Sequence, residues 1–149
     1  MEVATKVKHE FAVSLKWDEE AHNGIARSGN KMPVLFSAPI EFGGTDVVWS
    51  PEHLLAASLS SCYTTTFFYF ARLLKVDVKS FNLDVKMDIE KEGSGPFSAT
   101  KFTLRPHIVF NTLPVQAVID NLLSKAKRYC IISNSVKGEI VVEPEVAIA

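Results

Sequence analysis

Residues 50–62 read Ser50-Pro51-Glu52-His53-Leu54-Leu55-Ala56-Ala57-Ser58-Leu59-Ser60-Ser61-Cys62, and this stretch organises the fold. It is a strong helix start, because Ser50 can cap the helix, proline suits the first helical position, and Glu52 complements the positive end of the helix dipole. We expect the helix to run from Pro51 to about Lys75. Its apolar residues lie on nearly every side, so a single sheet could not cover them all and burial in a dimer is favoured.

The same helix contains a stretch without a charged residue, from Leu54 to Ala71, which is long enough to raise the question of a membrane span. The stretch carries six hydroxyl side chains, and strand-like segments flank it. These features favour a buried helix of a soluble protein, and we expect no membrane partner.

Alternating apolar and polar residues predict strands on both sides of this helix. Before it, residues 11–17, 25–27 and 34–36 predict an antiparallel meander whose first strand is half-buried. After it, residues 81–89 alternate without a fault, and a Gly-Ser-Gly-Pro turn leads into a returning strand over residues 97–110. The second pair predicts a hairpin.

A second helix is predicted after this hairpin, with basic residues near its end and Cys130 at its close. Residues 140–142 suggest a last strand, which Pro144 would end or fray. Pro106, within the returning strand of the hairpin, indicates an edge position or a bulge. The order of elements predicts an α+β fold with largely antiparallel sheets, in a single domain spanning residues 1–149.

Composition excludes several classes of protein. The 149 residues are 47% hydrophobic, which excludes global disorder, and the net charge of −1 provides no positive field for nucleic acid. Two cysteines are too few for a disulfide framework and are typical of a reducing compartment. Residues 1–8 contain no apolar run of secretory length, so we expect a cytoplasmic protein.

The sequence offers few candidates for chemistry besides its cysteines. The four histidines are scattered without metal-ligand spacing, and the glycine pairs lack phosphate-binding patterns, so neither a metal nor a bound cofactor is expected. Cysteines are more often inert core residues than reactive ones. If one is an attacking thiolate, Cys62 is the better candidate, because Cys130 lies where the negative end of a helix dipole would oppose thiolate formation.

Two motifs and the element order together resemble the OsmC/Ohr superfamily, which comprises osmotically inducible protein C and the organic hydroperoxide resistance proteins. The first motif is the segment from Ser50 to Cys62, in which a Pro-Glu pair is followed by a cysteine ten residues after the glutamate. The second is Tyr129-Cys130-Ile131-Ile132-Ser133-Asn134. The resemblance implies an intertwined homodimer whose two long helices pack centrally between sheets.

The resemblance also implies a cysteine-based peroxidase that reduces organic or inorganic hydroperoxides in oxidative stress defence. Cys62 would attack the peroxide as a thiolate and become a sulfenic acid, and Cys130 would resolve it as an intramolecular disulfide. An external thiol reductant must then reopen that disulfide. In the hydroperoxide-resistance branch this partner is a lipoylated protein.

Two further residues are implied for such a site. Glu52 would orient a basic group, but on one straight helix it lies about 15 Å along the axis from Cys62, so we hypothesise that each site uses Glu52 of the partner chain. The alternative is that Glu52 merely complements the helix dipole. The family's arginine in an Arg-Asp-Gly turn is replaced here by His22-Asn23-Gly24, and Arg27 is the nearest substitute, the alternative being a solvated strand residue.

Two other functions remain open at this stage. The chain could be a non-catalytic member of the superfamily that binds an apolar small molecule beside the aromatic residues 67–70, although an aromatic stripe on a buried helix is more often core. It could also be a thiol redox sensor, or a hydrolase, that uses Cys62.

Overall fold

The computed structural model describes residues 4–149, and the chain divides into two compact units, residues 1–54 and 55–149. Residues 1–3, which belong to the segment predicted to lack a secretory signal, lie outside the described residues. Within the described part of the chain, no helix combines the length and the apolarity that a membrane crossing requires.

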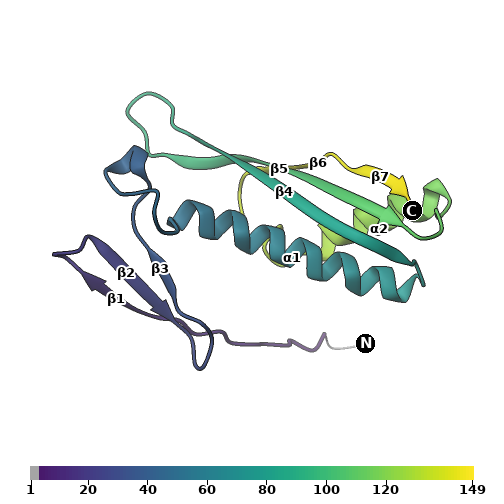
Figure 1. Ribbon diagram of the computed structural model, residues 1–149, viewed down its shortest axis with the longest axis horizontal. Coiled ribbons are helices and arrows are strands. Elements are labelled where there is room, and N and C mark those ends of the chain that lie inside the picture. The colour runs from purple at the N-terminus through teal and green to yellow at the C-terminus, as the bar shows by residue number, and fades with distance from the viewer. Residues whose placement is uncertain (1–3) are drawn as a thin grey trace. The chain divides into compact units, whose positions relative to one another are not determined.

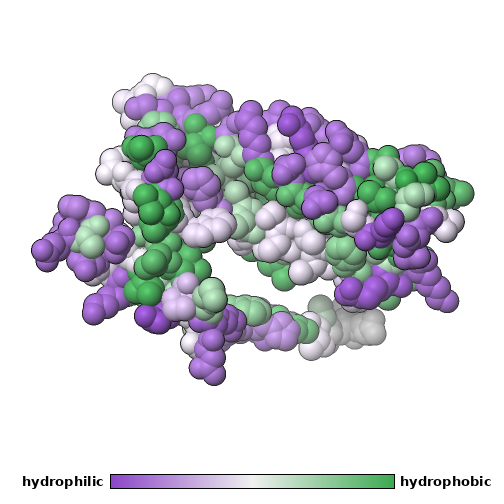
Figure 2. All heavy atoms as spheres, in the orientation of Figure 1, coloured by the Kyte–Doolittle hydropathy of each residue, from purple (hydrophilic) through white to green (hydrophobic). Residues whose placement is uncertain are grey.

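The first unit contains the predicted meander. Strands β1 (Ser14–Asp18), β2 (Asn23–Arg27) and β3 (Val34–Phe36) pair antiparallel in chain order. Gly24 in β2 leaves room for the ring of Phe36 on the neighbouring strand, because a Cβ atom there would overlap that ring unless the ring moved. All side chains of β1 are exposed within the chain, so the prediction of a half-buried first strand is wrong. Figure 2 accordingly shows apolar side chains on the surface of this unit, where β3 lies in Figure 1.

A loop with one 3-10 turn, η1 (Ile40–Phe42), connects the meander to the long helix. Helix α1 spans Pro51–Leu73, close to its predicted bounds. The Ser50 hydroxyl accepts a hydrogen bond of 3.1 Å from the backbone N–H of His53 and lies 2.6 Å from Nδ1 of the same residue. The predicted cap is therefore confirmed.

The second unit is built around a long antiparallel hairpin of β4 (Val78–Glu90) and β5 (Ser98–Phe110), followed by α2 (Gln116–Tyr129). Two short strands, β6 (Glu139–Val142) and β7 (Glu145–Ile148), then pair parallel to β5. The α+β fold is confirmed, but this sheet is mixed.

The break between β6 and β7 explains both prolines of this sheet. Pro144 ends β6 as predicted, but the chain resumes pairing at Glu145, so β7 was missed. Pro106 lies opposite this break in the central strand β5, and the register shifts of the hairpin occur elsewhere, so the prediction of an edge or a bulge at Pro106 is wrong. Proline is tolerated there because it has no N–H and the ladder on that side is interrupted.

Both helices pack against one face of this sheet, and α1 runs along the hairpin (Figure 1). The buried core takes one stripe of α1, one face of β5 and one stripe of α2. These residues are Leu59, Tyr63, Phe67 and Ala71 from α1, Phe102, Leu104, Ile108 and Phe110 from β5, and Ile119, Leu122 and Ala126 from α2. The opposite face of the hairpin is polar, and Figure 2 shows hydrophilic side chains over it. Leu55, Tyr69 and Leu73 on other sides of α1 remain exposed within the chain.

Candidate active site

The fold brings the two cysteines together from distant parts of the chain. Cys62 lies in α1, half-buried against the core, and Cys130 directly follows α2, within the core. Their side chains interact, because the Cys62 thiol is one of the groups that raise the pKa of Cys130. Because α1 and α2 pack on the same face of the sheet, two thiols that are remote in sequence become immediate neighbours.

Burial sets the protonation state of Cys130. Its side chain has no exposed surface, and this desolvation is the main cause of a pKa raised above the usual value for a thiol. The neighbouring Cys62 thiol raises the pKa of Cys130 further. Cys130 is therefore a neutral thiol at neutral pH.

The turn after α2 partly offsets this effect. Cys130 leaves the helix with extended backbone angles, and the backbone N–H of Ser133 donates to its sulfur at 3.5 Å. The side chain and the backbone of Ser133 both lower the pKa of Cys130, although burial outweighs them. The helix dipole of α2 was expected to oppose a thiolate here; the structure adds a donor from the following turn, which favours one.

Tyr63 places a second polar group in this part of the core. Its side chain is 0% exposed, and its hydroxyl has no hydrogen-bond partner within residues 4–149. Burial raises the pKa of this phenol strongly, and the negative charge of an ionised Cys130 would raise it further. Tyr63 therefore remains neutral over the whole physiological pH range.

The other two predicted site residues lie in the first unit. Glu52 is in the first turn of α1, half-buried, and its Oε2 atom is buried without a hydrogen-bond partner among the described residues. Arg27 ends β2, is exposed, and makes no ion pair in the described part of the chain. The structure thus places Cys62 against the core that holds Cys130, and among residues 4–149 no side chain forms a hydrogen bond or an ion pair with the Glu52 Oε2 atom.

An open aromatic cleft of about 300 Å³ lies on α1 one to two turns beyond Cys62. Its walls are Thr65, Thr66, Tyr69 and Phe70 from α1, and Tyr129, the residue before Cys130. The Phe70 and Tyr129 rings are 5.3 Å apart, and the ammonium of Lys125 lies 5.4 Å from the Phe70 centroid. Apolar walls with a cation nearby suit a ligand that is apolar with a polar or anionic end.

Thr65 and Thr66 connect this cleft to the first cysteine. The Thr66 hydroxyl donates to the backbone carbonyl of Cys62 at 2.7 Å, and the Thr65 hydroxyl donates to the same carbonyl at 3.1 Å. Both hydroxyl groups are thereby held against the helix, so their methyl groups are left to line the cleft.

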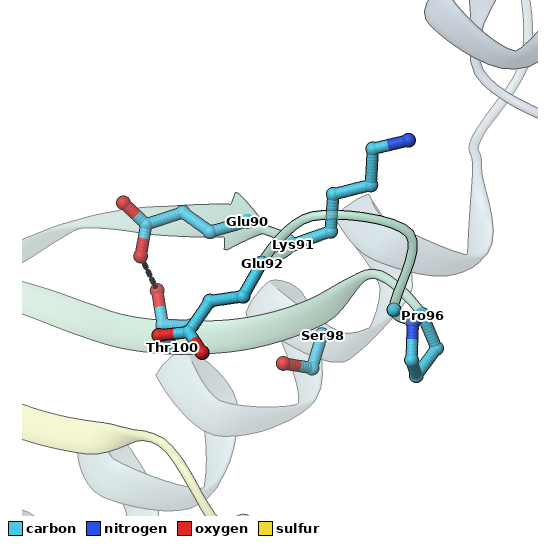
Figure 3. Close-up of a pocket in the computed structure, with 7 residues that line it drawn as sticks. Glu90, Lys91, Glu92, Pro96, Ser98 and Thr100 are labelled. Carbon is cyan, nitrogen blue, oxygen red and sulfur yellow. Dashed lines mark hydrogen bonds between the residues drawn. The ribbon is translucent and has the colours of Figure 1, made fainter.

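A second hollow, of about 460 Å³, lies at the end of the β4–β5 hairpin (Figure 3). Its walls carry charges and hydroxyl groups, including Glu90, which is hydrogen-bonded to Thr100. It contains neither cysteine, and within residues 4–149 no cluster of three or more His, Cys, Asp or Glu side chains is arranged to hold a metal ion. The cysteine pair is therefore the stronger candidate for chemistry.

The sequence did not single out Ser133 or Tyr63 as contributors to this site. Ser133 follows Cys130 by three residues, the spacing at which a backbone N–H returns to the side chain that opens a turn, so its position was a usable signal. Tyr63 gave no such signal, because an aromatic residue in a buried helix is read as core.

The fold and the site define an α+β protein in which a thiol on a long helix is paired with a thiol that follows a shorter one. A family model described as OsmC-like protein matches residues 44–145, which is more than half of the chain. The chain belongs to the OsmC-like protein family. No curated protein sequence is similar enough to count as a match.

Several solved structures share this fold. An OsmC-like protein of unknown function from Vibrio cholerae is 25% identical, with 93% of this chain and 100% of that chain covered and a TM-score of 0.84. An OsmC-like protein from Mycoplasma pneumoniae is 14% identical, with 95% and 99% covered and a TM-score of 0.79. An organic hydroperoxide resistance protein from Elizabethkingia anophelis, with bound thiocyanate, is 22% identical, with 97% and 100% covered and a TM-score of 0.72.

Proposed function

We propose that this protein is a cysteine-based peroxidase that reduces organic hydroperoxides in oxidative stress defence, with Cys62 as the peroxidatic and Cys130 as the resolving cysteine. The observation that carries the proposal is that the two thiols lie close enough to affect each other, one half-buried and one fully buried in the same core. Two inert core cysteines need not lie next to each other, whereas two cysteines that form a disulfide must.

The chemistry follows from the environments of the two sulfurs. The Cys62 thiolate attacks one peroxide oxygen, the O–O bond breaks, and the leaving alkoxide takes a proton to become an alcohol. Cys62 becomes a sulfenic acid. The Cys130 sulfur then attacks the Cys62 sulfur while its thiol proton goes to the departing hydroxide, so that water leaves and the disulfide closes.

The aromatic cleft, which neither cysteine lines but whose walls include Thr66, one turn from Cys62, and Tyr129, next to Cys130, supports an organic substrate in preference to hydrogen peroxide. Tyr69, Phe70 and Tyr129 offer apolar contact area that hydrogen peroxide could not use. The similar protein from Elizabethkingia anophelis is named for resistance to organic hydroperoxides, which agrees with this substrate class.

The complete site needs a homodimer in this proposal. The unpartnered Oε2 atom of Glu52 supports it, because a buried carboxylate oxygen without a donor is costly and a partner chain could supply one. Glu52 of one chain would then orient a basic group, with Arg27 as the candidate, beside Cys62 of the other chain. The disulfide is reopened by an external dithiol such as a lipoylated protein, in the cytoplasm.

The main test mixes the reduced protein with a stoichiometric organic hydroperoxide and follows peroxide and free thiols over seconds. We expect both thiols to disappear together with the peroxide. Cys62→Ser should abolish the reaction, and Cys130→Ser should stop at a sulfenic acid. Thiols that persist in excess hydroperoxide would remove the enzyme proposal and leave the fold unaffected.

The contribution of Glu52 across a dimer is tested by complementation. Neither Cys62→Ser nor Glu52→Gln should be fully active alone. In a mixed dimer, the chain with Cys62→Ser supplies an intact Glu52 and the chain with Glu52→Gln supplies an intact Cys62, so one wild-type site is rebuilt. Activity that appears only after the two are mixed supports the shared site; the absence of any gain, with mixed dimers shown by mass, assigns Glu52 to its own chain or to none.

A second candidate function is binding of an apolar small molecule without catalysis. The cleft of about 300 Å³ favours it, because its aromatic walls lie on the surface independently of the cysteines. Binding that is unchanged in a Cys62→Ser, Cys130→Ser double variant, together with thiols inert to hydroperoxide, would support it. A redox sensor would instead form the disulfide slowly and show no turnover with a dithiol.

A further inference from the structure

The two sulfurs of the proposed disulfide differ in their access to an external thiol. Cys130 has no exposed surface, whereas Cys62 is half-buried on α1, one turn before the first residues of the open aromatic cleft. Thiol–disulfide exchange requires the attacking sulfur to approach one sulfur of the disulfide and the other sulfur to leave. Only Cys62 offers that approach.

The turn after α2 supplies the buried sulfur with a hydrogen-bond donor that favours its departure, against the desolvation that raises its pKa. The backbone N–H of Ser133 donates to the Cys130 sulfur, and the Ser133 Oγ atom is buried beside it without a hydrogen-bond partner of good geometry among the described residues. A buried hydroxyl without a partner is costly, so its persistence at this position needs an explanation. An anionic sulfur at Cys130 would supply the missing acceptor.

The turn that holds Ser133 is fixed by further hydrogen bonds. The backbone N–H of Asn134 donates to the carbonyl of Cys130 at 3.2 Å, and the Asn134 side chain donates to the carbonyl of Arg128 at 2.8 Å. The second bond satisfies a carbonyl in the last turn of α2. Ser133 is therefore held at the sulfur by the backbone rather than by its own side chain.

We propose, given the peroxidase function above, that the external thiol attacks Cys62 and that Cys130 leaves, with Ser133 as a positioning residue that receives the departing sulfur. The reductant sulfur bonds to Cys62, the Cys62–Cys130 bond breaks, and its electron pair goes to Cys130. The Ser133 N–H and O–H stabilise the resulting thiolate. The second sulfur of a dithiol reductant then attacks the first, releases Cys62, and leaves the dithiol oxidised as a disulfide.

Burial of Cys130 favours the forward direction of these exchange steps. The same desolvation that raises the pKa of Cys130 causes its thiolate to take up a proton soon after it has left. A protonated thiol attacks a disulfide far more slowly than a thiolate does, so the return of Cys130 to the mixed disulfide on Cys62 is slowed. Ser133 thus lowers the barrier to leaving, and burial slows the reverse step.

The first experiment needs no variant. Wild-type protein is oxidised with diamide, mixed with excess 2-mercaptoethanol, quenched with acid at early times, treated with N-ethylmaleimide and mapped by mass spectrometry. We expect mercaptoethanol on the peptide of Cys62 and maleimide on that of Cys130. The reverse pattern would overturn the inference alone, because the starting disulfide does not depend on a hydroperoxide. Failure of diamide to close the disulfide would overturn the inference together with the proposed function.

The second experiment isolates Ser133. Removing one hydrogen bond to a departing thiolate should slow reduction of the disulfide by dithiothreitol about tenfold in Ser133→Ala. Ser133→Thr retains a hydroxyl and should recover most of the rate. Ser135→Ala is the matched control, because Ser135 lies in the same turn and its hydroxyl donates to the Ile131 carbonyl at 2.7 Å instead of to sulfur.

These variants separate positioning from a merely structural role. If Ser133→Ala reduces as fast as wild type, or if Ser135→Ala slows equally, Ser133 has no special part in the leaving step. Failure of Ser133→Thr to recover the rate, with an unchanged free energy of unfolding in urea, would also contradict the assignment.

Discussion

The Tyr63 hydroxyl allows a quantitative test of how this core is built, through the substitution Tyr63→Phe. The side chain is 0% exposed, and its hydroxyl is buried without a partner within residues 4–149. Since a buried hydroxyl without a hydrogen bond costs about 1–3 kcal/mol, its removal should stabilise the protein despite the small void that it leaves. We expect the free energy of unfolding to rise by about 1 kcal/mol at pH 8, at the lower end of that range.

The same substitution should matter more at alkaline pH. Tyrosine in the unfolded chain ionises with a pKa of about 10, whereas burial raises the pKa of Tyr63 in the folded protein. This difference in pKa leaves the stability of the wild type unchanged below pH 10 and lowers it as the pH rises further, because only the unfolded state then releases its proton. At pH 11 this loss is about 1.4 kcal/mol, so the free energy of unfolding of Tyr63→Phe should exceed that of wild type by roughly 2.4 kcal/mol.

Urea unfolding followed by circular dichroism, with reduced cysteines and at one fixed protein concentration, measures both effects. Fixed concentration matters because any assembly makes apparent stability depend on concentration. Tyr69→Phe is the matched control, since Tyr69 is on the same helix but 55% exposed, and it should change stability little at either pH. A loss of 1 kcal/mol or more in Tyr63→Phe, or a difference that does not widen at pH 11, would refute the reasoning.

Three more predictions concern stability. Closing the Cys62–Cys130 disulfide encloses about 70 residues and should raise the free energy of unfolding by about 4 kcal/mol, measured in urea against the reduced protein. Ser50→Ala removes the α1 cap and should cost about 1 kcal/mol, whereas Ser50→Asp should cost less. Gly24→Ala forces a Cβ atom against the Phe36 ring and should lower the melting temperature; Gly29→Ala, where a Cβ atom meets nothing, tests for a purely conformational effect.

The main elements could be predicted because local patterns carried them. Ser50 and Pro51 marked the start of α1, and the unbroken alternation of residues 81–89 marked β4. The pairing of strands β6 and β7 was harder to predict. The path of the chain after α2, rather than the residues of these short strands, decides that they pair parallel to β5. Pro144, which was expected to end or fray the last strand, ends β6 as predicted, but the chain pairs again in β7.

The candidate site was predictable as residue types but not as an arrangement. The motifs around Cys62 and Cys130 singled out both thiols, yet no pattern in the sequence gives the burial that separates a leaving sulfur from an accessible one. The contribution of Ser133 depends on the backbone of one turn. The alternating sequence of β1 predicts a half-buried strand, but all its side chains are exposed here. An alternating pattern identifies the apolar face of a strand and does not show whether another element covers that face.

The interrupted edge of the second sheet has a consequence for solubility during folding. An exposed sheet edge offers unpaired N–H and C=O groups on which another chain can add a strand and begin aggregation. Here that edge consists of two four-residue strands, β6 and β7, with Pro144 between them. Proline offers no N–H, and the Glu143 side chain at the same break is held by the Arg105 guanidinium at 2.9 Å. An incoming strand could pair with only a few residues on either side of this interruption, so fibrillar growth from this edge is disfavoured.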